Sequence, residues 1–297
     1  MSAARLWIMA ARPRTLPAAI APVLVGTAAA VYVTNGEEFR IGAFVAALLG
    51  SVFIQVGTNL VNDYSDARRG ADTVDRLGPV RVTASGLVTP QRVLVATWLA
   101  FAVALACGVY LTAVAGPLIL AVGLASIAAG VLYTGGPRPY GYEGLGEFFV
   151  FLFFGLVAVN GSYYVQLEEL DGLPFGLSVS VGFLAAAILV VNNIRDADTD
   201  ARVGKRTLAV QLGRERSRGL FRALLIGAAA ILPLTLLAWD GPAVALLALL
   251  VAPLALRLDQ IVRTRSDGPA LNEALAGTGA LTGIFSLLVS AGLLFAS

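Results

Sequence analysis

The sequence predicts an all-helical integral membrane protein, and three observations support that fold class. Of the 297 residues, 58% are hydrophobic and only 13% are charged, whereas a typical soluble domain has about 25% charged residues. The mean hydropathy is +0.81. Apolar stretches long enough to cross a bilayer as a helix, roughly 17–25 residues, recur along the chain. We therefore expect one transmembrane domain, residues 1–297, with most of its surface in contact with lipid.

Nine apolar segments can be marked. In chain order they cover approximately residues 15–34, 41–61, 92–113, 117–134, 145–165, 175–194, 219–239, 242–262 and 274–296. The first segment follows three arginines, a pattern also seen in signal peptides, but it is long enough to span and further spans follow. We expect it to be retained as the first of nine transmembrane helices. The shortest separations are at Gly116-Pro117 and Asp240-Gly241-Pro242.

The basic residues are distributed unevenly between the two ends of these segments. Of 21 Lys and Arg residues, 20 lie before the first segment, in the loops after the even-numbered segments or at the adjoining helix ends; only Arg40 lies on the other side. Short loops rich in Lys and Arg stay in the cytoplasm. We therefore expect a cytoplasmic N-terminus and a C-terminus outside.

Two residue types that support many enzyme mechanisms are scarce. The chain has no histidine, which excludes a Ser-His-Asp triad and any His-ligated metal. Its single cysteine, Cys107, lies inside an apolar run. It has no partner for an intrachain disulfide and no second thiolate for a metal site.

Two acidic clusters lie at the ends of the second and sixth segments, and both contain Asn-x-x-x-Asp with a further Asp one helical turn later. The first cluster has Asn59, Asp63 and Asp66 at i, i+4 and i+7. The second has Asn192, Asp196 and Asp200 at i, i+4 and i+8. Either spacing places three oxygen-bearing side chains on one helix face.

Carboxylates are costly at a membrane boundary unless they have partners, so the clusters indicate a functional site. Oxygen ligands suit Mg²⁺, which usually takes one or two carboxylates and completes its shell with substrate phosphate. Both clusters are expected on the cytoplasmic side, four helices apart, and a weak internal repeat could bring them face to face. We therefore expect the two clusters to hold Mg²⁺ ions that bridge a diphosphate.

Cations suited to a diphosphate follow both clusters. Lys205 and Arg206 come after the second cluster, and Arg76 and Arg81 come after the first; lysine binds phosphate as a point charge and arginine as a fork. An alternative interpretation is that they are only the positive charges of cytoplasmic loops.

A membrane site for a diphosphate suggests a polyprenyl diphosphate. Ionisation of its C–O bond would leave an allylic cation, which aromatic faces stabilise. Tyr133, Tyr140 and Tyr142 lie on the same cytoplasmic side and are candidates for this role, although interfacial tyrosines are common in membrane proteins.

Together these motifs resemble the UbiA superfamily of intramembrane aromatic prenyltransferases. The strongest resemblance is in the two acidic clusters and in Gly204-Lys205-Arg206-Thr207. Further similar stretches are Arg12-Pro13-Arg14-Thr15, Gly78-Pro79-Val80-Arg81, Tyr133 to Tyr142, and Gly144-Leu145-Gly146-Glu147. The chain departs from the family pattern at Gly70, where a third acidic residue is often found; Asp72 lies two residues later.

The resemblance implies nine transmembrane helices around a central cavity open to the cytoplasm and to lipid, in a bacterial plasma membrane. The flanking stretches are most similar to members that prenylate 1,4-dihydroxy-2-naphthoate in menaquinone biosynthesis, with loss of diphosphate and CO₂. It implies that Asp63, Asp66, Asp196 and Asp200 hold Mg²⁺, that Lys205 is catalytic, and that the substrate-binding residues are Asn59, Asn62, Asn192, Arg76, Arg81, Arg206, Tyr133, Tyr140 and Tyr142.

Two alternatives remain at this point. The acceptor could instead be 4-hydroxybenzoate, homogentisate or haem. The protein could also be a secondary transporter for an organic anion, but transporters more often place charged residues near the membrane midplane on broken helices. The clusters here lie at helix ends, which favours an enzyme. No nucleic-acid partner is expected.

Overall fold

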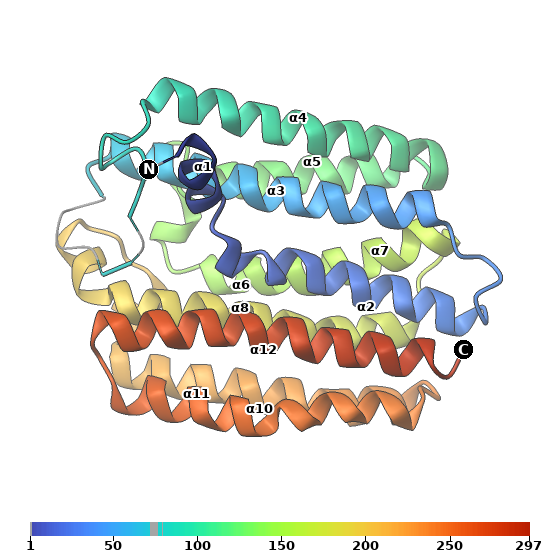
Figure 1. Ribbon diagram of the computed structural model, residues 1–297. Coiled ribbons are helices and arrows are strands. Elements are labelled where there is room, and N and C mark those ends of the chain that lie inside the picture. The colour runs from blue at the N-terminus through green and yellow to red at the C-terminus, as the bar shows by residue number, and fades with distance from the viewer. Residues whose placement is uncertain (1, 72–76, 79) are drawn as a thin grey trace.

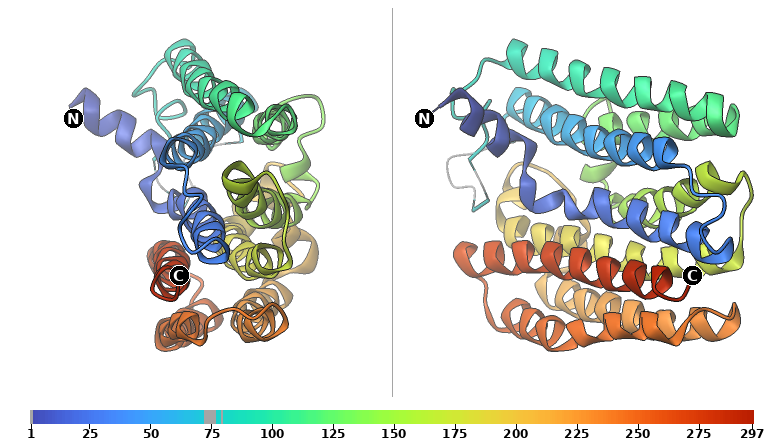
Figure 2. Two further views of the ribbon diagram at one scale, coloured as in Figure 1. Left: turned by 90° about the vertical axis from the view of Figure 1, so that its right-hand side faces the viewer. Right: turned by 45° about the vertical axis from the view of Figure 1, so that its right-hand side comes forward.

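The computed structural model describes residues 2–71, 77–78 and 80–297, and the described residues form helices and no strands (Figure 1). The long helices run side by side along one direction, and the two chain termini lie at opposite ends of the bundle (Figure 1). The end view in Figure 2 shows α4 in teal and α10 and α11 in orange at opposite sides of the bundle. The predicted all-helical fold is confirmed.

The elements are, in chain order, α1 (Ala3–Ala11), η1 (Pro13–Thr15), α2 (Pro17–Val33), α3 (Ile41–Arg68), α4 (Pro90–Ala115), α5 (Leu118–Leu132), η2 (Tyr140–Tyr142), α6 (Gly146–Val150), η3 (Phe151–Val157), α7 (Ala158–Leu167), α8 (Gly172–Arg202), α9 (Leu208–Leu212), α10 (Arg214–Ala238), η4 (Ala243–Val251), α11 (Ala252–Thr264) and α12 (Gly268–Leu294).

Each of the nine apolar segments lies in a helix or in a run of consecutive helices. Seven described helical runs are long and apolar enough to cross a membrane, and the bent pair of α1–η1 with α2, at 56°, makes a possible eighth. The remaining segment is α5, which has 15 residues and is therefore about 22 Å long, shorter than a hydrocarbon core of about 30 Å. The count of nine spans is not confirmed and stays a prediction.

Helix α8 is the central element of the bundle. In its most apolar window 78% of the residues are buried, against 22% in α3 and 33% in α10. A helix that is apolar on all sides is stable only when other helices surround it, and α8 packs against α10, α12 and η3. The C-terminal part of this buried helix contains the whole second acidic cluster.

The broken helix α6–η3–α7 lies unusually close to α8. A Cβ atom added to Gly155 would come within 2.6 Å of the Gly182 Cα and 2.8 Å of the Ser178 carbonyl oxygen. Small residues permit such close backbone approach between membrane helices. The seven residues of η3 form a π-helical segment, a distortion that is frequent at functional sites.

The loop of residues 80–88 is held against the end of α3 where the first acidic cluster lies. Val82 and Val88 are buried in a small apolar cluster with Ala10, Leu60 and Val93. Within the loop, the Val88 amide donates to the Val82 carbonyl oxygen at 3.0 Å. This packing holds Arg81 beside the acidic cluster.

The arrangement of helices allows a direct test of orientation. In a Cys107→Ser background, Glu169→Cys in the loop between α7 and α8 should react with an impermeant maleimide only from outside the cell. Arg138→Cys, exposed in the loop between α5 and α6, should react only from the cytoplasmic side, because basic loops stay inside. Labelling of right-side-out and inverted vesicles measures both, and a reversed pattern would overturn the topology.

Candidate active site

A cavity of about 330 Å³ opens among α3, α4, α5, α6–η3–α7 and α8. Its mouth is polar and includes Asn62, Asp66, Asp196, Asp200 and Lys205. Its other lining is largely apolar and contains many small residues. On α3 both Asp66 and Ala47 line it, and a rise of 1.5 Å per residue separates them by about 28 Å along the helix. A charged mouth therefore leads into an apolar space that extends through most of the membrane.

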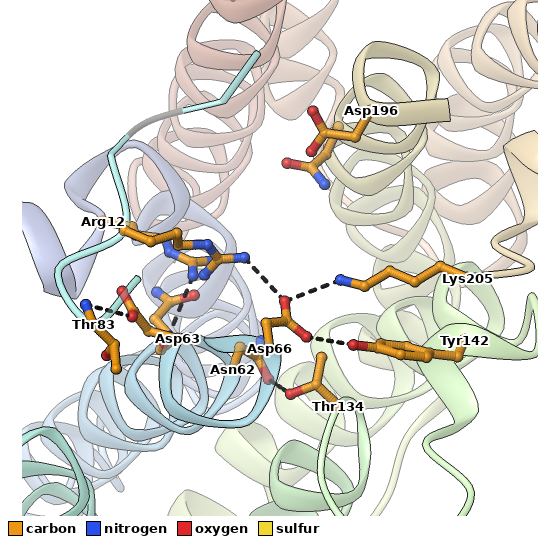
Figure 3. Close-up of polar contacts among 12 residues, drawn as sticks. Arg12, Asn62, Asp63, Asp66, Thr83, Thr134, Tyr142, Asp196 and Lys205 are labelled. Carbon is orange, nitrogen blue, oxygen red and sulfur yellow. Dashed lines mark hydrogen bonds and ion pairs between the residues drawn. The ribbon is translucent and has the colours of Figure 1, made fainter. Parts of the chain in front are cut away.

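Asp66 is the carboxylate at the centre of the mouth (Figure 3). The Tyr142 hydroxyl donates to its Oδ1 at 2.7 Å, the Lys205 ammonium to its Oδ2 at 3.1 Å and the Arg81 guanidinium to the same oxygen at 3.3 Å. The Lys205 Nζ also lies 4.7 Å from the Tyr142 ring centroid. Lys205 and Arg81 therefore place two cations at the mouth, where an anionic ligand could contact them.

Asp63 has a different environment from Asp66. Its two carboxylate oxygens accept the backbone amides of Val82 and Thr83, at 3.1 and 3.0 Å, and Figure 3 shows the carboxylate directed toward Thr83. Asp63 is buried and is absent from the cavity lining. The structure therefore brings Asp66 to the cavity and places Asp63 under the loop that contains Arg81.

In the second cluster, Asp196 is paired with the neighbouring Arg195. The guanidinium donates to both Asp196 oxygens, at 2.8 and 2.6 Å, and also to the Oδ1 atoms of Asn192 and Asn272. Asn272 in turn donates to the Leu77 carbonyl oxygen. Arg195 is 1% exposed, and this network links α8 to α12 and to the segment that follows the first cluster.

Sequence reasoning missed Arg195 as a site residue, since it was counted only as a cytoplasmic loop charge. The available signal was its position between Asn and Asp at the end of an apolar segment. Arg12 lies in a stretch that resembles the family but was not predicted as a site residue; it lines the cavity, and its guanidinium donates to the Asn59 carbonyl oxygen at 3.5 Å. Arg195 lies within α8, and a charge inside an otherwise apolar helix is more informative than a charge in a loop.

The three candidate asparagines all line the cavity. The Asn59 side chain donates to the Ala11 carbonyl oxygen at 3.1 Å and to the Thr15 hydroxyl at 3.2 Å, so it links α3 to the bend between α1 and α2. Asn62 accepts the Thr134 hydroxyl at 2.7 Å. Asn192 is held by Arg195, as described above. These amides connect the helix ends around the mouth.

Aromatic rings form one wall of the cavity below the mouth. The Tyr133 and Tyr140 rings meet edge to face at 5.5 Å, Tyr140 stacks on Phe149 at 4.1 Å, and Phe149 lies parallel to Phe153 at 6.2 Å. All four residues line the cavity. The tyrosines were predicted, whereas the two phenylalanines are additions from the structure. Burial raises the pKa of Tyr140 well above its ordinary value, so its hydroxyl, which donates to the Ala129 carbonyl oxygen, stays neutral.

Of the predicted cations, Arg206 does not reach the cavity, and Arg76 lies outside the described residues. Arg206 is exposed and its backbone amide donates to the Tyr142 carbonyl oxygen; its side chain is absent from the lining. Asp72 also lies outside the described residues. Lys205 and Arg81 are the predicted cations that the structure brings to Asp66.

The acidic residues suit a metal that arrives with a phosphate better than a prebuilt metal cage. Among the described residues, no three His, Cys, Asp or Glu side chains converge closely enough to hold an ion. Asp66, Asp196 and Asp200 nevertheless line one cavity from two helices, and all offer oxygen. Mg²⁺ is commonly bound by one or two carboxylates plus phosphate and water, and these residues fit that mode.

The two environments of the first cluster predict different mutant behaviour. Asp63→Ala removes the acceptor for two backbone amides and should lower the free energy of unfolding by at least about 1–3 kcal/mol, seen as a lower Tm in detergent. Asp63→Asn retains one acceptor oxygen, so its Tm should lie between those of Asp63→Ala and the wild type. Neither should change the Mg²⁺ concentration for half-maximal activity in the folded fraction. A large shift in that Mg²⁺ concentration, with an unchanged Tm, would instead identify Asp63 as a Mg²⁺ ligand.

Curated relatives match nearly the whole chain. The chain is 43% identical over 289 residues to a 1,4-dihydroxy-2-naphthoate octaprenyltransferase of Mycobacterium tuberculosis, covering 97% of each chain. It is 36% identical over 286 residues to the Escherichia coli protein of the same name, covering 94% of this chain and 91% of that one.

Solved structures share the fold. A UbiA homolog from Aeropyrum pernix K1 superposes with a TM-score of 0.71 at 15% identity, covering 92% of this chain and 96% of that chain. A UbiA homolog from Archaeoglobus fulgidus, bound to GPP and Mg²⁺, superposes with a TM-score of 0.64 at 16% identity, covering 96% and 99%. The model of the UbiA prenyltransferase family matches residues 19–276. With that match and relatives of this identity over nearly its full length, the chain belongs to the UbiA prenyltransferase family.

Proposed function

We propose that this protein transfers a polyprenyl chain from its diphosphate to 1,4-dihydroxy-2-naphthoate, releasing diphosphate and CO₂ and producing demethylmenaquinol. The structural observation that supports this most is the charged mouth at Asp66, which leads into a long apolar space. That shape matches a donor with an anionic head and a hydrocarbon tail. The names of the relatives at 43% and 36% identity support the naphthoate acceptor.

The diphosphate is proposed to bind at the mouth, next to Lys205 and Arg81. Both cations pair with Asp66 in the structure, and an incoming diphosphate offers them a larger negative charge. The predicted Mg²⁺ would be held by Asp66, Asp196 and Asp200 with phosphate oxygens, and when bound it supplies positive charge to the leaving group. Asp63 could join as a ligand only by releasing the Val82 and Thr83 amides.

The prenyl tail is proposed to lie along the apolar cavity, with its allylic carbon just below the mouth. There the C–O bond breaks and its electron pair leaves with the diphosphate. The wall of Tyr133, Tyr140, Phe149 and Phe153 presents ring faces and edges to the resulting cation, and ring faces stabilise cations when water is excluded. The apolar lining limits access of water, which would otherwise capture the cation.

The acceptor ring then forms the new C–C bond at the carbon that bears its carboxylate. Loss of CO₂ from that carbon restores the aromatic ring, so no external oxidant or reductant is needed. The two ring hydroxyls make the naphthoate electron-rich, which favours attack on an allylic cation.

The position of the mouth, together with the distribution of basic residues, supports a cytoplasmic entrance in a bacterial plasma membrane. We also propose that residues 1–297 act as one domain.

The activity itself can be tested with purified protein. Incubation with a prenyl diphosphate and a panel of aromatic acids should give a prenylated product and diphosphate in equal amounts, with 1,4-dihydroxy-2-naphthoate as the preferred acceptor by mass spectrometry. Turnover should stop after chelation and return with Mg²⁺, since the site offers oxygen ligands. Prenylation of 4-hydroxybenzoate or homogentisate instead would contradict the acceptor, and full turnover after exhaustive chelation would contradict the metal.

Lys205 and Asp196 should fail differently when substituted. Lys205→Ala removes a contact present in both the bound donor and the transition state, so it should raise KM for the donor more than it lowers kcat. Asp196→Asn removes a negatively charged ligand of the proposed Mg²⁺, which neutralises the leaving diphosphate as the C–O bond breaks. It should therefore lower kcat by about 100-fold or more. Arg216→Ala and Glu37→Gln, both exposed, are matched controls that should behave as wild type. Near-normal kcat for Asp196→Asn at saturating Mg²⁺ and donor would rule out the second cluster as a metal site.

A further inference from the structure

Glu147 is a buried carboxyl group that the proposed mechanism does not use. It lies in the first turn of α6 and is 8% exposed. Its Oε1 accepts the side-chain amide of Asn193 at 2.8 Å, while its Oε2 is buried and has no hydrogen-bond partner among the described residues. Burying a carboxyl group with a single partner is costly.

Asn193 connects this carboxyl group to the cavity. It lines the cavity from α8, and its spacing from Asp196 and Asp200 (i, i+3, i+7) places all three on one face. The Asn193 amino group is directed to Glu147, so its carbonyl oxygen points the other way. Within the part of the chain that the structure describes, no donor is recorded for that oxygen. Glu147 thus orients Asn193 so that it presents an acceptor atom.

The position of Asn193 relative to the mouth indicates which ligand it meets. It lies about one helical turn below Asp196, while Ile188 and Leu189 line the cavity one turn further down. With the diphosphate at the proposed level of Asp196, the allylic carbon lies near the level of Asn193. The aromatic wall is close, because a Cβ atom on Gly146 would lie 3.2 Å from the Tyr133 ring.

We infer that the carbonyl oxygen of Asn193 accepts a hydrogen bond from a ring hydroxyl of the aromatic acceptor, and that Glu147 is the residue that positions this oxygen. The inference rests on the proposed function and adds the residue that selects a hydroxylated ring. An amide oxygen repels the oxygens of a diphosphate but binds a phenolic O–H. A site built to bind a substrate hydroxyl discriminates strongly against an analogue that lacks the donor. The same bond holds the ring beside the allylic carbon, which is where attack occurs.

The test compares Glu147→Gln and Asn193→Ala with the wild type on three acceptors, 1,4-dihydroxy-2-naphthoate and its two monomethyl ethers. Glutamine has nearly the shape of glutamate but can donate as well as accept, so it no longer dictates which way the Asn193 amide points. Each variant should raise KM for the parent acceptor by about tenfold, with KM for the donor and the Mg²⁺ requirement unchanged. The double variant should be no worse than Asn193→Ala, because the two residues act as one unit.

The decisive readout is the preference for the parent acceptor over the ether in which the bound hydroxyl is blocked. Wild type should show a large preference in kcat/KM, and both variants should lose most of it. A purely structural role would lower both rates equally and leave the ratio unchanged. Asn160→Ala is the matched control and should keep the wild-type ratio. Among the described residues, the Asn160 side chain on α7 donates to the Leu156 carbonyl oxygen alone.

The outcomes separate this inference from the proposed function. An active wild type whose acceptor preference survives in both variants would overturn the inference alone. A shift in donor KM or in the Mg²⁺ requirement, with unchanged acceptor KM, would assign the pair to the diphosphate site and also overturn it. A wild type that does not prenylate the naphthoate would overturn both. Asn193→Ala leaves Glu147 in place, so the test does not depend on the folding of the Glu147 variant.

Discussion

The burial of Asp66 is the constraint on which the rest of the site depends. At 1% exposure, this carboxylate is stable only if donors replace its lost hydration, and three elements supply them: the loop of residues 80–88 through Arg81, η2 through Tyr142, and the segment after α8 through Lys205. Segments far apart in the sequence are therefore held at one point. The same cations are available to a phosphate that arrives with its own counterion, so the interactions that stabilise buried Asp66 also prepare the mouth for an anionic substrate.

The two acidic clusters are coupled through one short stretch of chain. Asp63 binds the Val82 and Thr83 amides from one side, and Arg195 reaches the Leu77 carbonyl oxygen through Asn272 from the other. Arg81 lies between these anchors and pairs with Asp66. Asp63 and Arg195 thus have structural tasks, while Asp66 and Asp196 line the cavity. A change at Asp63 or Arg195 is expected to act on the site by moving Arg81 and Asp196.

The charged and the apolar side chains of the cavity lie at different depths. Cations and carboxylates gather at the mouth, where helix ends reach water, and aromatic and aliphatic side chains line the space below. The π-helical segment η3 and the close contact of Gly155 with α8 hold the helix that contributes Phe149 and Phe153. Between the two zones lie Asn193 and its hydrogen-bond partner Glu147. Their depth matches the level proposed above for the contact between the prenyl carbon and the aromatic ring.

The sequence by itself determined the fold class, the two acidic clusters and the side of the bundle on which they meet, because hydropathy, helical spacing and charge asymmetry are local properties of the chain. It also named Asp66, Asp196, Asp200, Lys205 and the three tyrosines, all of which line one cavity. Only the tertiary structure separated Asp63 from Asp66, although they lie one turn apart, since the loop amides that occupy Asp63 come from a segment nearly twenty residues later. Only the tertiary structure turned Arg195 inward, left Arg206 exposed and joined Glu147 to Asn193. These outcomes depend on which side chains face each other across helices, and no spacing along a single helix contains that information.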